Sequence, residues 1–342
     1  PLAPAKALLH GILQVAGQEH PWLGCRVLDL DPSEPAPRVR AGWLRAAMAG
    51  PEDPAVARRG GRHWILEHAH QPLPTGADPL RRGGTYAVIG HVAEGIGRVW
   101  AGEIARHPTA RLALIEAEGA LPLPPEDPAG AMRLTVNCTD RAALAQALDR
   151  VEAGLGRIDG VFLSTPFSDA RSAAPLALSG QAQTGHVHRT CRAPAEALAA
   201  ALDGRRAGFA CLQSSMASVI GGAGLAAYAA GHHHTDLLAA AMDRQGGTRW
   251  HAIGWDMLAG DGPRATGDHA LLAAEVWNAT CRILNSGSGG PVSVSRSDVA
   301  ARRRQWLNPV PRLPDTGAAN AARARPALDT PYLAPRTPLE AQ

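Results

Sequence analysis

Residues 83–97, GGTYAVIGHVAEGIG, predict a buried strand, a glycine-bearing turn and the start of a helix. The strand is expected over residues 85–90, which form a short and nearly continuous apolar run. Glycines in such a turn let the backbone approach a pyrophosphate, and the N-terminus of the following helix attracts the anion. Taken alone this signal is weak, because short glycine motifs match many unrelated sequences.

The same alternation of strand and helix continues along the chain. Further apolar runs predict strands at 110–116, 132–138, 158–165, 208–215, 249–256 and 291–296. Amphipathic stretches predict helices around 98–106, at 140–154, near 193–202 and after Tyr228. Short buried strands alternating with helices are typical of a parallel sheet covered on both faces. We therefore expect an α/β fold with a Rossmann-type doubly wound parallel sheet over residues 80–310.

The two ends of the chain have different patterns. Strands at 25–31 and 62–70 with a helix at 39–48 predict a small, truncated α/β structural subdomain over residues 1–79. Residues 311–342 are rich in proline, alanine and arginine and predict an extended linker. Because the first residue is Pro1, we expect the chain to be a fragment of a longer polypeptide.

Composition excludes several classes of partner. The chain has 342 residues and a net charge of +3, and its arginines form no basic stripe with interleaved aromatics, so a nucleic-acid partner is not expected. The run Arg302–Arg304 predicts a solvated helix face. No apolar run is long enough for a membrane span. The five cysteines show no Cys-x-x-Cys spacing, which disfavours a metal site and suits a reducing, cytoplasmic location.

A second stretch, LQSSMASVIGGAGLAAYAAG (212–231), places Ser215 at a strand end and Tyr228 thirteen residues later at a helix start. This spacing resembles the catalytic pair of short-chain dehydrogenases, and the surrounding sequence resembles the ketoreductase domains of modular polyketide synthases. The resemblance extends to GQEHPWLGCRVLDLDP (17–32) and RIDGVFLST (157–165). TPYLAPRTPLEAQ (330–342) is similar to the linker that leads to an acyl carrier protein.

The resemblance implies a division of catalytic roles. In the family, the tyrosine protonates a ketone while NADPH delivers hydride, the serine binds the same oxygen, a lysine lowers the tyrosine pKa, and an asparagine holds a relay water. It assigns Ser215 and Tyr228 to catalysis, whereas His232 stands where the asparagine is expected and Cys191 where the lysine is expected. Since Lys6 is the single lysine of the chain, no lysine can serve Tyr228. Arg189 or Arg192 could supply charge, although an arginine cannot pass on a proton.

The cofactor positions that the resemblance implies are altered as well. They are Gly90, Gly95, Gly97, Asn137 and Thr165. Asn137 replaces an aspartate, and Pro166 and Phe167 follow Thr165 where the family has small residues. Glu94 adds negative charge beside the expected pyrophosphate, and Glu116 to Glu118 replace an arginine for the 2′-phosphate. We therefore expect no cofactor, or NADPH or NADH if the site is active.

Three successive histidines, His232 to His234, raise the question of a metal site. Adjacent residues of a helix point in different directions, so these three cannot bind one ion from a single face. We expect no metal, and histidines that face solvent or line a groove. Cys191 is expected to serve packing.

These observations predict a ketoreductase-like domain of a polyketide synthase that is unable to reduce β-ketoacyl carrier-protein substrates and acts as a structural or scaffold domain. The expected partners are an acyl carrier protein and neighbouring synthase domains. One alternative is an NAD(P)H-dependent β-ketoacyl reductase with an unusual site. Another is a redox-silent epimerase of 2-methyl-3-ketoacyl substrates. A free-standing dehydrogenase is disfavoured by the carrier-type linker.

Overall fold

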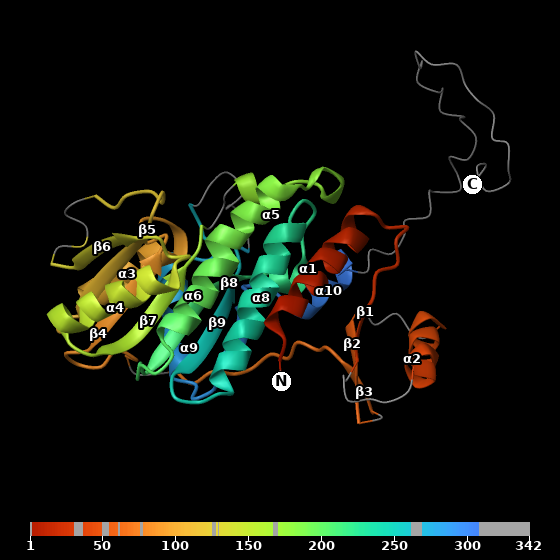
Figure 1. The fold of residues 1–342 in the computed structure, drawn as a ribbon, viewed down its shortest axis with the longest axis horizontal. Helices are drawn as coiled ribbons and strands as arrows, with labels where there is room; N and C mark the ends of the chain where they lie inside the picture. Colours follow the sequence, from red (N-terminus) through yellow and green to blue (C-terminus); the bar gives the residue numbers. More distant parts are fainter. Residues whose placement is uncertain are drawn as a thin grey trace, which may run out of the picture. The chain divides into compact units, whose positions relative to one another are not determined.

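A seven-stranded parallel sheet forms the centre of the fold (Figure 1). The computed structural model describes residues 2–30, 37–49, 55–60, 62–75, 78–124, 128, 130–166, 170–260 and 269–307. The strands follow the order β10-β9-β8-β7-β4-β5-β6. They are β4 (Thr85–Gly90), β5 (Arg111–Ala117), β6 (Met132–Val136), β7 (Ile158–Ser164), β8 (Phe209–Ser215), β9 (Arg249–Trp255) and β10 (Gly290–Val294). This is the doubly wound arrangement expected from the sequence.

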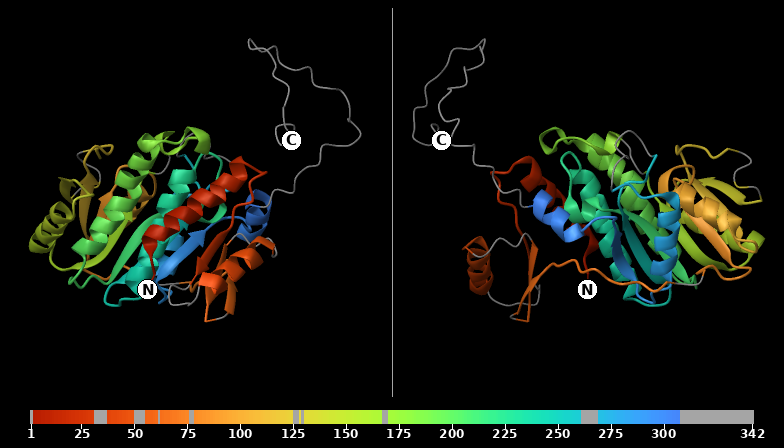
Figure 2. Two further views of the ribbon diagram at one scale, coloured as in Figure 1. Left: turned by 45° about the vertical axis from the view of Figure 1, so that its right-hand side comes forward. Right: turned by 180° about the vertical axis from the view of Figure 1, so that it is seen from behind.

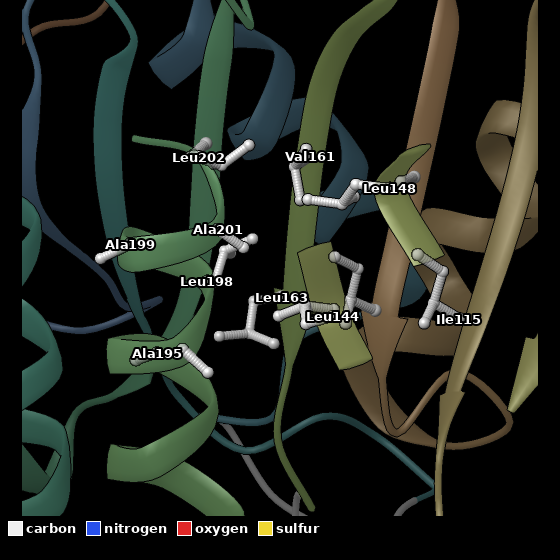
Figure 3. Close-up of a cluster of buried hydrophobic side chains, with 14 of the residues drawn as sticks. Ile115, Leu144, Leu148, Val161, Leu163, Ala195, Leu198, Ala199, Ala201 and Leu202 are labelled. Carbon is white, nitrogen blue, oxygen red and sulfur yellow. The ribbon is translucent and has the colours of Figure 1, made fainter. Parts of the chain in front are cut away.

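Helices cover both faces of the sheet (Figure 2). One face is covered by α4 (Arg141–Leu155), α6 (Ala193–Ala201) and α8 (Ala226–Asp243), and the other by α3 (Gly95–Arg106) and α9 (Ala273–Leu284). Successive residues of β4 alternate between the two cores: Ala87 and Ile89 face α4, whereas Tyr86 and Val88 face α3. Leu144, Leu148 and Leu198 fill the first core between helices and sheet (Figure 3).

The N-terminal residues form a second, smaller sheet. It contains β1 (Val27–Leu30), β2 (Ala55–Arg59) and β3 (Arg62–Ile65), with β1 parallel and β3 antiparallel to β2. The helix α2 (Pro37–Ala49) connects β1 to β2. A small N-terminal α/β subdomain was predicted from the sequence, and this sheet confirms it.

Two further helices accompany the large sheet. The first, α1 (Pro4–Glu19), lies beside α8 (Figure 1), and the second is α10 (Val299–Leu307). The helix at α10 was expected, but the expectation that its arginines are all solvated is wrong. Arg302 pairs with Asp256, its Nη2 donating to Oδ1 at 3.2 Å, and the two side chains are only 11% and 4% exposed. The reason is that Asp256, at the end of β9, needs a buried cation.

The remaining expectations concern the ends of the chain. The described residues belong to one compact unit. The predicted linker at 311–342 lies outside the described residues, and the boundary at residue 79 stays a prediction. None of the helices within the described ranges combines the length and apolar character needed to cross a membrane.

Candidate active site

The predicted site residues gather at the carboxyl edge of the sheet. Gly90, Ser164 and Ser215 are the last residues of β4, β7 and β8. Strand order reverses between β4 and β7, so this edge contains the topological switch point at which doubly wound folds bind ligands. Ser215, which was singled out by its spacing to Tyr228, therefore lies at this edge of the sheet.

Ser215 ends β8 and starts the turn into the short helix α7 (Ala217–Ile220). Its Oγ accepts a hydrogen bond from the Ala217 N–H at 3.2 Å, and its side chain also bonds to the phenol of Tyr228. The structure thus brings together the serine and tyrosine that the sequence analysis paired.

Tyr228 lies in the first turn of α8, where its half-buried ring packs against the buried cluster that includes Val15 and Ala217. Burial raises the pKa of Tyr228 above its ordinary value, and the neighbouring Cys191 raises it further. The hydrogen bond with Ser215 acts in the opposite direction. Because the first two effects dominate, the phenol is a weaker acid than a free tyrosine.

Cys191 and His232 complete the site around Tyr228. The Cys191 Sγ lies 4.0 Å from the His232 Nε2, and the His232 ring meets the Tyr228 ring edge-on at a centroid distance of 4.3 Å. Burial raises the pKa of the Cys191 thiol to about 12 and lowers the pKa of His232 to about 3. Both groups are therefore neutral near pH 7.

Among the described residues, no positively charged group contributes to the pKa of Tyr228. Of the two arginines considered from the sequence, Arg192 donates to Glu196 at 3.0 Å instead. Cys191 itself lies in a π-helical turn, His188–Arg192, that joins α5 (Gln181–Val187) to α6. Such turns are frequent at functional sites, but here the turn presents a thiol.

The presence of the glycines in the turn after β4 can be explained without a cofactor. Gly90 has a φ of +99°, and a side chain there would collide with the Ser164 carbonyl oxygen. A Cβ at Gly97 would lie 2.5 Å from the Ser164 Oγ and would meet the His91 carbonyl. Gly95 begins α3 with a φ of +53°. The close approach of β4 to β7 thus requires Gly90, and the packing of α3 against β7 requires Gly97.

The charges around this turn do not fit a phosphorylated dinucleotide. Glu94 is the N-cap of α3, and its carboxylate bonds to the His91 Nδ1 at 2.9 Å. A pyrophosphate would have to bind at this helix end, where an acidic side chain now lies. At the end of β5, Glu116 accepts from Arg133 at 3.0 Å. That position therefore presents an internal ion pair where the family resemblance implies an arginine for a 2′-phosphate.

Asn137 and Thr165 make local contacts. The Asn137 Oδ1 accepts from the Thr139 N–H at 3.0 Å and from its hydroxyl at 2.6 Å, which forms a turn before α4. The Thr165 N–H donates to the Gln213 Oε1 at 3.0 Å, while its buried Oγ1 has no hydrogen-bond partner among the described residues. Phe167, which was expected to fill the cofactor groove, lies outside the described residues.

The three successive histidines differ from expectation. His232 and His234 are buried at 0% and 1% exposure rather than facing solvent, because α8 lies beneath α1 and α6. His234 bonds to Glu196 at 3.0 Å, and His233 bonds to Gln14 at 3.2 Å. Across the described ranges, no three histidine, cysteine or acidic side chains are placed to hold a metal ion.

The contribution of α1 was not predicted from the sequence. Gln14, Gln18 and Glu19 hydrogen-bond to backbone groups of the loop between Ser215 and Tyr228. A helix at these positions was signalled by Pro4 at its start and Pro21 just beyond its end.

Comparison with known proteins agrees with this geometry. The KR domain family matches residues 84–260. The chain is 31% identical over 280 residues to the polyketide synthase ThaG of Burkholderia thailandensis, and 30% identical over 290 residues to the pikromycin polyketide synthase component PikAIII of Streptomyces venezuelae. These alignments cover 72% and 79% of this chain but only 5% and 18% of the two synthases.

Solved structures share the fold. A ketoreductase from the first module of phoslactomycin biosynthesis in Streptomyces sp. HK803 has a TM-score of 0.73 at 24% identity, with 90% of this chain and 73% of that one covered. An A1-type ketoreductase has a TM-score of 0.73 at 22% identity, with 89% and 67% covered. From the family match across half of its length, the chain belongs to the ketoreductase domains of polyketide synthases, within the short-chain dehydrogenase superfamily.

Proposed function

We propose that this ketoreductase domain does not reduce a ketone and serves its synthase as a structural domain. One observation carries the proposal: the phenol of Tyr228 borders the neutral Cys191 and His232 instead of a cation. A phenol transfers its proton in a catalytic step only if the phenolate that remains is stabilised. Here burial destabilises the phenolate, and within the described part of the chain the Ser215 hydrogen bond is the one contact in its favour.

The cofactor turn supports the same proposal. Ketoreductase domains typically use NADPH, whose pyrophosphate and 2′-phosphate are both negatively charged. In this chain Glu94 lies at the N-terminus of α3, and Glu116 at the end of β5 is already paired with Arg133. A phosphate at either place would meet a carboxylate. We infer that NADPH binds weakly or not at all, independently of the state of Tyr228.

A structural role fits the context of related proteins. The two curated relatives are polyketide synthases, and one solved structure of this fold combines adenylation, ketoreductase and pseudo Asub domains in a keto acid-selecting NRPS module. We propose that residues 1–79 and 80–310 form the two subdomains of such a unit. Residues 311–342 would then link it to an acyl carrier protein, with further synthase domains as neighbours.

Reduction is tested directly with the purified domain. NADPH and NADH are each mixed with a β-ketoacyl thioester on a pantetheine-like thiol, and the nicotinamide absorbance is followed. We expect no ketone-dependent oxidation and no rise in melting temperature with either nucleotide, because a ligand that does not bind the folded state cannot stabilise it. Turnover that disappears in Tyr228→Phe but persists in Tyr86→Phe would overturn the proposal.

Epimerisation is separated by a second measurement. The test is loss of α-deuterium from a carrier-bound 2-methyl-3-ketoacyl thioester, which needs a base but no hydride. The available bases are poor, because the His232 pKa is lowered to about 3 and the Tyr228 pKa is raised. We expect no washout above that of Tyr228→Phe. Washout that requires Tyr228 would replace the structural role with an epimerase.

A further inference from the structure

The N-terminal helix α1 forms part of the wall around Tyr228. It packs so closely on α8 that a Cβ at Gly11 would lie 2.6 Å from the Ala230 Cα. Val15, one turn further along α1, is fully buried in the same apolar cluster as Tyr228 and Leu176. Residues of α1, which are distant in sequence from Tyr228, thus pack around this tyrosine.

Side chains in the second half of α1 hold the loop that joins Ser215 to Tyr228. The Gln14 Nε2 donates to the Val219 carbonyl, and the Gln18 Nε2 donates to the Ile220 carbonyl, each at 2.7 Å. The Gln18 Oε1 accepts from the Gly222 N–H, also at 2.7 Å. Because this loop connects Ser215 to Tyr228, its path determines where they meet.

Glu19, the last residue of α1, joins this loop to a second segment. Its Oε1 accepts from the Gly224 N–H at 2.7 Å, and its Oε2 accepts from the Leu176 N–H at 2.6 Å. The Leu176 segment, which includes the 3-10 turn Leu176–Leu178, also contacts the loop directly: the Ala174 N–H donates to the Gly224 carbonyl at 2.8 Å. Each carboxylate oxygen therefore accepts from a different segment, and hydrogen bonds to an ionised acceptor are the stronger kind.

We propose that Glu19 is a positioning residue whose carboxylate holds the segment at 174–176 against the loop at 222–224 and so fixes the enclosure of Tyr228. The proposal concerns the shape of the site and is independent of whether the domain reduces a ketone. A glutamine of the same size cannot replace Glu19, because its amide nitrogen would face one of the two N–H donors.

The test uses Glu19→Gln in the full chain. We expect the amide hydrogens of Leu176 or Gly224 to exchange about tenfold to hundredfold faster, the factor that corresponds to losing one hydrogen bond to a charged acceptor. The chain has three tyrosines, so labelling their ζ-carbons gives three NMR signals, with Tyr228 assigned from Tyr228→Phe. The pKa of Tyr228 should fall towards its ordinary value, because water would reach the phenol.

Glu275→Gln is the matched control. The Glu275 Oε2 accepts from the Leu272 N–H at 2.8 Å at the start of α9, on the opposite face of the sheet. This variant also neutralises a carboxylate that accepts from the backbone, while its amide oxygen can still accept from the single Leu272 N–H, and it should leave the Tyr228 titration unchanged. If Glu19→Gln retains the exchange rates of both amides and the Tyr228 pKa, the proposal is wrong. If it does not fold, Glu19→Asp, which keeps the charge but is too short to span both donors, is judged by the same two readouts.

Discussion

Replacing Cys191 by lysine would place an ammonium beside the phenol of Tyr228. The Cys191 Sγ lies 4.0 Å from the His232 ring nitrogen, and that ring lies 4.3 Å from the Tyr228 ring. A lysine side chain from this turn can therefore approach the phenol oxygen. The substitution isolates one question, namely whether a cation at this position lowers the pKa of Tyr228 that burial raises.

The size of the effect follows from Coulomb attraction. An ammonium about 5 Å from the phenolate attracts it by ~3 kcal/mol at an effective dielectric constant of about 20. Since ~1.4 kcal/mol corresponds to one pKa unit, the pKa of Tyr228 should fall by about 2 units. Burial also lowers the pKa of the new lysine, so this fall is an upper figure that holds while the lysine is charged.

The assay is the pH titration of ζ-13C-tyrosine signals, in which Tyr86 and Tyr332 serve as internal references. Cys191→Met is the control, because it adds similar length without charge. A Tyr228 pKa that is equal in the lysine and methionine variants, with the lysine protonated, would refute the reasoning. Ketone reduction should stay absent even in Cys191→Lys, since Glu94 still occupies the cofactor turn. Reduction by this variant would show that the turn accepts a nicotinamide cofactor.

Three further predictions concern stability. Gly97→Ala should lower the free energy of unfolding by ~1–3 kcal/mol, since the added Cβ lies 2.5 Å from Ser164. Gly102→Ala in the same helix meets no atom within 4 Å and should raise it by ~0.5–1 kcal/mol; equal effects in denaturant titrations would contradict this packing argument. Asp256→Asn leaves Arg302 without its buried carboxylate and should cost ~3–5 kcal/mol, so a loss below ~1 kcal/mol in the same assay would show that the pair behaves as if exposed. Burial lowers the pKa of His251 from 6.5 to about 4, so between these values the unfolded chain binds a proton that the folded chain does not. Stability should therefore fall as the pH drops, by ~1.4 kcal/mol per pH unit from this group; His251→Phe should flatten the measured slope, and an unchanged slope would count against the assignment.

The central sheet could be predicted from sequence because its strands are buried on both faces. β4 was predicted with the correct ends, and β7, β8 and β9 were predicted to within a residue at each end. Such strands produce short apolar runs, which are visible without knowledge of their neighbours. β2 was missed, because its AVARR sequence is only partly buried and carries no such run.

The site could be predicted only in part, for a related reason. Ser215 and Tyr228 were found from their spacing, and Cys191 and His232 from their positions relative to that pair. Glu19 was missed because its partners are 157 and 205 residues away and are backbone groups, which no residue pattern reveals. Asp256 and Arg302 show the same limit, since a run of arginines looks solvated until the buried carboxylate 46 residues earlier is placed beside it.

Two sets of residues can be compared. Those that match the ketoreductase pattern have packing roles in the fold, whereas those that depart from it lie where the family reaction sets the requirement. Gly90 lets β4 approach β7, Gly97 lets α3 pack on β7, Ser215 caps the turn into α7, and Tyr228 packs against a cluster that includes Val15 of α1. These contacts do not depend on catalysis. The departures lie at Cys191, His232 and Glu94, where family chemistry requires a cation, a polar relay or an uncharged turn, whereas packing requires only suitable volume. The chain thus matches the ketoreductase pattern where the fold constrains the residue and differs where only the reaction would constrain it. This is the pattern expected of the proposed structural role.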